Sequence, residues 1–211
     1  MKYHDITPVD LLNGEGLRTV LWVSGCEMNC KECQNPQTWD PNDGLEFDED
    51  ARKELFSYLE KDYISGITFS GGHPLHPANV EMILGLINEI RTSYKDKTIW
   101  TYTGYDFAYV MSDYYIANRN KVKESDAKKI ISMRRDILVS SDVVVDGPFI
   151  EEKKDVNYHW AGSTNQKVID VKETMKNLAM DFCILDDISE DNINFPFVYN
   201  LLTNDIVLYD N

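Results

Sequence analysis

The 211-residue sequence has no apolar run near the roughly 20 residues that cross a bilayer. Residues 1–10 also lack the basic stretch and apolar core of a secretory signal, so we expect a cytoplasmic protein without a membrane partner. Positive charge is scarce as well: 21 Lys and Arg oppose 36 Asp and Glu, giving a formal net charge of −15. Phosphate binding needs clustered Lys and Arg, so we expect no nucleic-acid partner. The one basic stretch, 119–135, is typical of a solvated helix face.

Cysteine is rare, and the cysteines are unevenly distributed along the chain. The chain has four cysteines, of which Cys26, Cys30 and Cys33 lie close together and Cys183 is remote. Disulfides are not expected in a reducing cytoplasm, where clustered thiols are more often metal ligands or catalytic groups. The apolar neighbours of Cys183 predict a buried, inert thiol.

Hydrophobic patterning predicts strands that alternate with helices. The predicted strands are residues 17–24, 66–70, 98–103, 142–145 and 167–171. The predicted helices are residues 48–61, 77–94, 105–115 and 127–135. Such alternation is typical of an α/β fold with a mostly parallel sheet.

The pattern weakens towards the C-terminus. The short apolar runs at 182–185 and 197–208 are read as strands or as an appended hairpin. We therefore divide the chain into one domain over residues 1–170 and a C-terminal extension, residues 171–211, of open role. No internal repeat or low-complexity tract interrupts this organisation.

Three unusual segments follow predicted strands. The cysteines follow the first strand, Gly71-Gly72 follows the second and Gly104 follows the third. Ligand sites of parallel sheets lie at the carboxyl ends of the strands. We therefore expect these segments to converge at one edge of the sheet.

The cysteine spacing, C-x3-C-x2-C, suits an iron–sulfur cluster, because thiolates from one loop can wrap it. Three thiolates would hold three irons of a [4Fe–4S] cluster and leave the fourth iron open to a non-protein ligand. The spacing also permits a zinc site, for which Cys183, His73 or His76 would supply the fourth ligand. Spacing alone leaves both readings open.

The context of the cysteines resembles a known superfamily. C-x3-C-x2-C directly after a strand, with Gly71-Gly72-His73-Pro74 after the next, resembles the radical S-adenosylmethionine enzymes. More narrowly, the chain resembles the anaerobic ribonucleoside-triphosphate reductase activating proteins over roughly residues 1–166. The matching stretches, in order, are Pro8-Val9-Asp10, Asn13-Gly14-Glu15-Gly16, Ser24-Gly25-Cys26, Cys33-Gln34-Asn35, Thr38-Trp39, His73-Pro74-Leu75-His76-Pro77, Trp100 to Tyr105, Asp146-Gly147 and Gly162-Ser163-Thr164-Asn165-Gln166.

This resemblance implies a fold and an activity. The fold would be a partial, (β/α) barrel-like sheet of mostly parallel strands. Cys26, Cys30 and Cys33 would hold a [4Fe–4S] cluster whose unique iron binds S-adenosylmethionine. One electron would cleave this cofactor into methionine and a 5′-deoxyadenosyl radical, which takes a hydrogen atom from a glycine of the reductase large subunit. A small electron-donor protein is the second partner implied.

The resemblance also implies cofactor-binding residues. Gly71 and Gly72 would meet the methionine end, since a backbone without Cβ lets the cofactor approach closely. Glu32, Cys33 and Gln34 would line the adenosyl side, largely through backbone groups. No catalytic residue is implied beyond the cluster ligands.

Some positions depart from the family pattern. The family usually has an acidic residue where this chain has His73, and we interpret the His73 side chain as free, with the backbone making the contact. The family often has Tyr where this chain has Gln34, and residues 118–135 resemble an insertion.

Four aromatic residues near the motifs are read as structural. Trp39 and Trp100 are predicted to pack, and Tyr102 and Tyr105 are predicted to lie in the core or at the rim of the site. Two alternatives to the activating enzyme remain. One is another radical enzyme that acts on a small molecule, and the other is a zinc-stapled interaction module.

Overall fold

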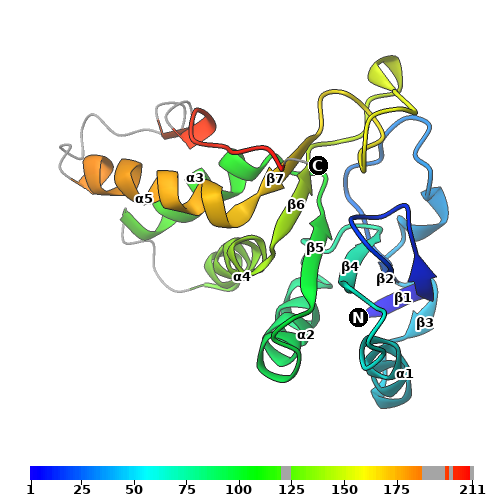
Figure 1. The fold of residues 1–211 in the computed structure, drawn as a ribbon. Helices are drawn as coiled ribbons and strands as arrows, with labels where there is room; N and C mark the ends of the chain where they lie inside the picture. Colours follow the sequence, from blue (N-terminus) through cyan, green and yellow to red (C-terminus); the bar gives the residue numbers. More distant parts are fainter. Residues whose placement is uncertain (120–124, 187–197, 200–201, 210–211) are drawn as a thin grey trace.

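The computed structural model describes residues 1–119, 125–186, 198–199 and 202–209 (Figure 1). Its strands are β1 (Lys2–Asp10), β2 (Arg18–Val23), β3 (Leu45–Glu46), β4 (Gly66–Gly71), β5 (Thr98–Tyr102), β6 (Val143–Asp146) and β7 (Lys167–Asp170). Its helices are α1 (Glu49–Leu59), α2 (Val80–Ser93), α3 (Phe107–Arg119), α4 (Asp126–Ser140) and α5 (Val171–Asp186), with 3-10 turns at Pro36–Thr38 and Glu151–Lys153.

The strands form one seven-stranded sheet in the order β3-β1-β2-β4-β5-β6-β7. The pairs β2–β4, β4–β5 and β5–β6 are parallel, while β1, β3 and β7 pair antiparallel at the flanks. The predicted α/β class is confirmed. The sheet of the described residues is open, however, with β3 and β7 as its edges, so it does not close as a barrel would.

The elements differ from the sequence-based prediction at β1, at the two-residue β3, which was not predicted, and near the C-terminus. β1 was not predicted, because its burial is irregular and its polar residues hide the strand pattern. The predicted strand at 182–185 was wrong, since these residues lie in α5. Val171, Thr174 and Leu178 are all buried at helical spacing and start this helix from the end of β7. Of the run at 197–208, residue 197 lies outside the described residues, and Leu208 forms an isolated bridge with Ile169.

The main core lies between the helices and one face of the sheet. Ile67, Phe69 and Ile99 of the strands are fully buried there with Leu55 of α1 and Ile87 of α2. Side chains of neighbouring strand residues point to opposite faces. Trp100, which follows Ile99, accordingly belongs to a smaller cluster on the other face.

The C-terminal residues share the main core. Val171 and Leu178 of α5, and beyond it Val198 and Leu202, are buried in the same cluster as the strands. The division at residue 170 stays a prediction. Among the described residues, no helix is long and apolar enough to cross a membrane.

A buried arginine joins the starting ends of the parallel strands. The Arg18 guanidinium donates to Thr68 Oγ1 (2.8 Å), to Thr98 Oγ1 (2.8 Å), and to the backbone oxygens of Ile67 (2.6 Å), Glu15 (3.0 Å) and Thr98 (2.9 Å). Burial lowers the pKa of Arg18 to about 10. The group remains charged at neutral pH, and its hydrogen bonds hold β2, β4 and β5 in register.

Helix α1 begins with a side-chain cap at Asp48. The Asp48 carboxylate accepts hydrogen bonds from the backbone N–H groups of Asp50 and Ala51, both at 3.0 Å. Asp48→Ala is expected to lower the free energy of unfolding by about 1 kcal/mol, as loss of an N-cap usually does. Urea unfolding of the metal-free protein measures this. Asp62→Ala, which changes an exposed acidic residue beyond the other end of the helix, is the control, and equal stability of the two variants would contradict the assignment.

Candidate functional site

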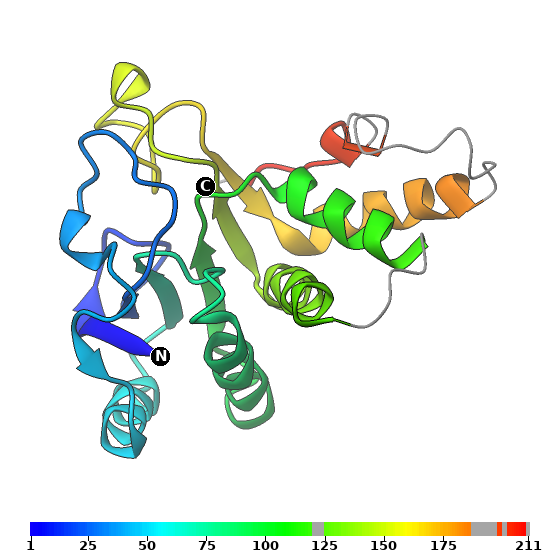
Figure 2. The same cartoon turned by 180° about the vertical axis from the view of Figure 1, so that it is seen from behind.

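A cavity of about 750 Å³ lies at the carboxyl ends of the parallel strands. The loop after β2 and the loop between β6 and β7 rise above this edge of the sheet (Figures 1 and 2). The predicted convergence is confirmed. The lining residues include Asp10 to Asn13, Trp22, Cys26, Met28, Cys30, Cys33 to Asn35, Trp39, Ser70 to Gly72, Tyr102 to Gly104, Gly147 to Phe149, Val156 to Gly162 and Gln166.

The cysteine loop, residues 25–39, is folded by its own backbone. The Gly25 N–H donates to the Thr38 carbonyl (2.7 Å), and the Cys26 N–H donates to that of Trp39 (3.0 Å). Asn29 and Glu32 have positive φ values of 46° and 55°, which turn the chain sharply between the cysteines. The three thiols are consequently brought to the wall of one cavity.

The thiols of this loop suit a metal cluster. Cys26, Cys30 and Cys33 are half-buried, and none of them forms a disulfide. Burial raises the pKa of Cys26 and Cys30, so a metal must displace protons when it binds there. Thiolates are soft ligands of the kind that iron–sulfur clusters use.

The spread of the thiols is also compatible with a cluster. Within the described ranges, no three His, Cys, Asp or Glu side chains gather as closely as a single ion requires. A [4Fe–4S] cluster does not require it, because each of the three thiolates binds a different iron. The donor set therefore fits the cofactor that the sequence suggests.

Gly71-Gly72 joins the end of β4 to the cysteine loop. The Gly72 N–H donates to the Val23 carbonyl (2.8 Å), and the His73 N–H donates to that of Gly25 (2.7 Å). Gly71 has φ of 97°, a conformation that favours glycine. A Cβ on Gly72 would lie 2.7 Å from Gly25 O and 2.9 Å from Thr38 O. Only glycine allows the backbone segments of this wall to approach so closely.

The His73 side chain is not free, so that part of the interpretation was wrong, while the backbone contact with the cofactor stays a prediction. It is 1% exposed. Its Nδ1 lies 3.0 Å from Glu27 Oε2, and its Nε2 lies 2.8 Å from Thr103 Oγ1. Glu27 follows the first cysteine directly, and Thr103 follows β5. His73 therefore connects the cysteine loop to the end of a third strand.

Glu27 is the centre of this network and was not predicted. Tyr105 donates its hydroxyl to the Glu27 carboxylate, and Arg134 Nη2 of α4 lies 3.6 Å from Glu27 Oε1. Burial alone would raise the pKa of Glu27. The hydrogen bond with His73, the charge of His73 and the hydrogen bond from Tyr105 together lower this pKa to about 2. Arg134 also covers the Tyr105 ring at 4.7 Å. The basic stretch is thus not wholly a solvated face.

Replacing His73 tests this connection. His73→Ala would leave Glu27 and Thr103 without a shared partner, and we expect the free energy of unfolding to fall by about 2 kcal/mol. His4→Ala is the matched control, because His4 Nε2 has no hydrogen-bond partner among the described residues. Urea unfolding of both metal-free variants makes the comparison. Equal losses in the two would show that the His73 bonds contribute nothing to stability.

Other predicted residues are placed with mixed results. Gln34 lines the cavity, whereas the exposed Glu32 does not, and its cofactor role stays a prediction. Trp100 packs as predicted, with 1% exposure, while Trp39 and Tyr102 contribute to the cavity wall. The Cys183 side chain lies outside the described residues.

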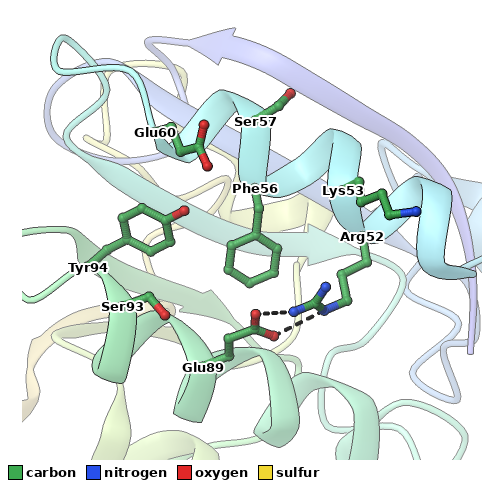
Figure 3. A pocket seen from close by; sticks show the side chains of 8 residues that line it. All are labelled: Arg52, Lys53, Phe56, Ser57, Glu60, Glu89, Ser93 and Tyr94. Atoms are coloured by element: carbon green, nitrogen blue, oxygen red, sulfur yellow. Dashed lines mark hydrogen bonds and ion pairs between the residues drawn. The ribbon is translucent and has the colours of Figure 1, made fainter.

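A second, smaller hollow of about 270 Å³ lies between α1 and α2 (Figure 3). Arg52 of α1 donates to the Glu89 carboxylate of α2 through Nε at 3.1 Å and also through Nη2. Phe56 and Tyr94 form its apolar floor. It contains none of the predicted site residues, so the larger cavity is the candidate site.

Comparison with known proteins agrees with this site. A family profile described as a 4Fe-4S single cluster domain matches residues 12–169, which include all three clustered cysteines. Curated relatives named anaerobic ribonucleoside-triphosphate reductase-activating protein align over most of both chains. The Vibrio cholerae relative is 34% identical over 170 residues, covering 80% of this chain and 97% of the relative. The Haemophilus influenzae relative is 37% identical over 168 residues (79% and 96%), and that of Escherichia coli K12 is 37% identical over 170 (80% and 97%). The chain therefore belongs to the family of anaerobic ribonucleoside-triphosphate reductase-activating proteins.

Proposed function

We propose that the protein activates an anaerobic ribonucleoside-triphosphate reductase by generating a glycyl radical on its large subunit. One observation carries this proposal: the three cysteines and Gly71-Gly72 line the same cavity in a member of this family. When bound there, a [4Fe–4S] cluster supplies the electron that cleaves S-adenosylmethionine.

The chain's own residues would hold and orient the reactants. Cys26, Cys30 and Cys33 would bind the cluster, leaving one iron for the cofactor. The backbone at Gly71 and Gly72, which lines the cavity, would receive the methionine end. Cys33 and Gln34, which line the cavity, and Glu32, which precedes them in the loop, would bind the adenosyl side of the cofactor. The His73–Glu27 pair keeps the first cysteine fixed against this wall.

The cavity mouth suits a large substrate better than a free metabolite. Leu12 and Val156 line the cavity and yet are 80% and 86% exposed. Apolar side chains left this open at a site entrance are typical of surfaces that a partner covers. A loop of the reductase that carries the glycine could therefore reach into the cavity from this side.

The remaining expectations form part of the same proposal. A small electron-donor protein would reduce the cluster, the protein would work in the cytoplasm, and neither nucleic acid nor membrane would be a partner. The barrel-like form of the sheet is likewise proposed by resemblance to the superfamily.

Anaerobic purification followed by iron and sulfide analysis tests the cofactor assignment. The reduced, reconstituted protein should then release methionine and 5′-deoxyadenosine from S-adenosylmethionine, and adding the reductase should produce a glycyl-radical spin signal. A reconstituted cluster without cofactor cleavage would refute the proposal. Stoichiometric zinc without iron or sulfide would favour an interaction module, and turnover of a small molecule without reductase would favour a different radical enzyme.

A further inference from the structure

The tail segment, residues 206–209, lies outside the residues that the family profile matches but returns to the sheet. Leu208 pairs with Ile169 in an antiparallel bridge. The Asp170 N–H donates to the Val207 carbonyl (2.9 Å), and the Tyr209 N–H donates to that of Val168 (2.8 Å). The tail therefore runs beside β7, and it leads towards the strand ends that bear the cavity (Figure 1).

Tyr209 extends from this tail into an aromatic cluster. Its ring centroid lies 5.4 Å from that of Trp100 and 5.9 Å from that of Trp160. Its hydroxyl donates to the carboxylate of Glu15, in the loop between β1 and β2. This bond, together with burial, raises the pKa of Tyr209 to about 12. One tail side chain thus joins three segments that are remote in sequence.

Trp160 is the member of this cluster that reaches the cavity. It lines the cavity wall and has φ of 56°, a left-handed conformation that costs a non-glycine residue energy and needs support from its surroundings. Its carbonyl accepts a hydrogen bond from the Tyr102 hydroxyl (2.8 Å), and its ring meets Trp100 edge to face at 4.9 Å. The neighbouring His159 ring stacks on it at 5.0 Å, and Tyr209 supplies the ring contact that comes from the tail.

We propose that Tyr209 is a positioning residue that holds Trp160, and with it residues 157–162, in place as one wall of the cavity. The tail, which the family profile does not include, then completes the site. The expected effect of Tyr209 on cofactor binding rests on the proposed function. The contacts among Tyr209, Glu15 and Trp160 themselves do not depend on it.

The test compares Tyr209→Ala with Tyr209→Phe, which keeps the ring and removes only the bond to Glu15. In metal-free protein we expect Tyr209→Ala to reduce the near-ultraviolet circular dichroism of the tryptophans and to speed amide exchange at 157–162 about tenfold. In reconstituted protein we expect the KM for S-adenosylmethionine to rise about tenfold with little change in kcat. Tyr209→Phe should retain most of both properties. Tyr63→Ala, which removes a tyrosine that is 59% exposed, should change neither.

If Tyr209→Ala does not fold, Tyr209→Leu gives the result, because it keeps an apolar side chain in the cluster and removes the ring that contacts Trp160. We expect it to speed amide exchange at 157–162 more than Tyr209→Phe does. Unchanged tryptophan signals and exchange in the folded variant that lacks the ring would overturn the inference. Wild-type protein that binds a cluster but cleaves no S-adenosylmethionine would refute the proposed function alone, because the metal-free measurements would still decide the role of Tyr209.

Discussion

Cys30→Ala protein will fail to hold a stable [4Fe–4S] cluster, and Cys26→Ala and Cys33→Ala will behave alike. Each cysteine is expected to bind one iron, so removal of any one leaves a second iron without a protein ligand. Iron and sulfide after anaerobic reconstitution should fall to background, and with them all cleavage of S-adenosylmethionine. Far-ultraviolet circular dichroism should remain close to wild type, because none of the three side chains belongs to the main core.

Cys183→Ala is the matched control for these variants. It removes a thiol of α5, remote in sequence from the cysteine loop. We expect this variant to reconstitute with the full iron and sulfide content of the wild type. Loss of the cluster in Cys183→Ala would show that the assignment of three ligands is wrong and that Cys183 is itself a metal ligand.

Gly72→Ala is expected to cause the second large effect, a loss of about 3 kcal/mol in the free energy of unfolding. The added Cβ would meet the backbone oxygens of Val23, Gly25 and Thr38 at 2.7 to 2.9 Å. Backbone atoms cannot turn aside as a flexible side chain can, so the cysteine loop must separate from the end of β4. Urea unfolding of the metal-free protein measures the loss, and weaker binding of S-adenosylmethionine should accompany it.

Gly85→Ala makes the same chemical change where nothing opposes it. Gly85 is exposed within α2, and its Cβ would have no heavy atom within 4 Å. Alanine forms helices better than glycine, so this variant should gain about 0.5 to 1 kcal/mol. Opposite signs for the two variants are the expected result. A Gly72→Ala protein as stable as the wild type would mean that the close approach of the backbones is not required.

The parts of the site that could be predicted are those encoded by short segments. The cysteine spacing and Gly71-Gly72 each follow a strand, and the parallel order of β2 and β4 brings them together. Glu27 and His73 flank these two segments, but their pairing was not predicted because the sequence does not show which way the side chains of a loop point. A buried histidine also looks no different in sequence from a free one.

The parts of the fold that were missed have similar physical reasons. The apolar run at 182–185 is too short for its period to distinguish a strand from a helix, and only the buried residues before it show that α5 continues. β7 was predicted, but its reversed direction was not, because the residues of a strand do not encode which neighbour it joins. The residues that hold Trp160 in place lie in β5 and in the tail, and no local sequence pattern indicates that these two segments meet.

The edges of the sheet affect how readily the protein aggregates at high concentration. An exposed edge strand offers unpaired N–H and C=O groups to other molecules and so promotes aggregation. Here β3, at one edge, has only two residues, and β7, at the other, is paired along its outer side by the tail from Val207 to Tyr209. The segment that supports the cavity wall therefore also shields the β7 edge of the sheet from pairing with a second chain.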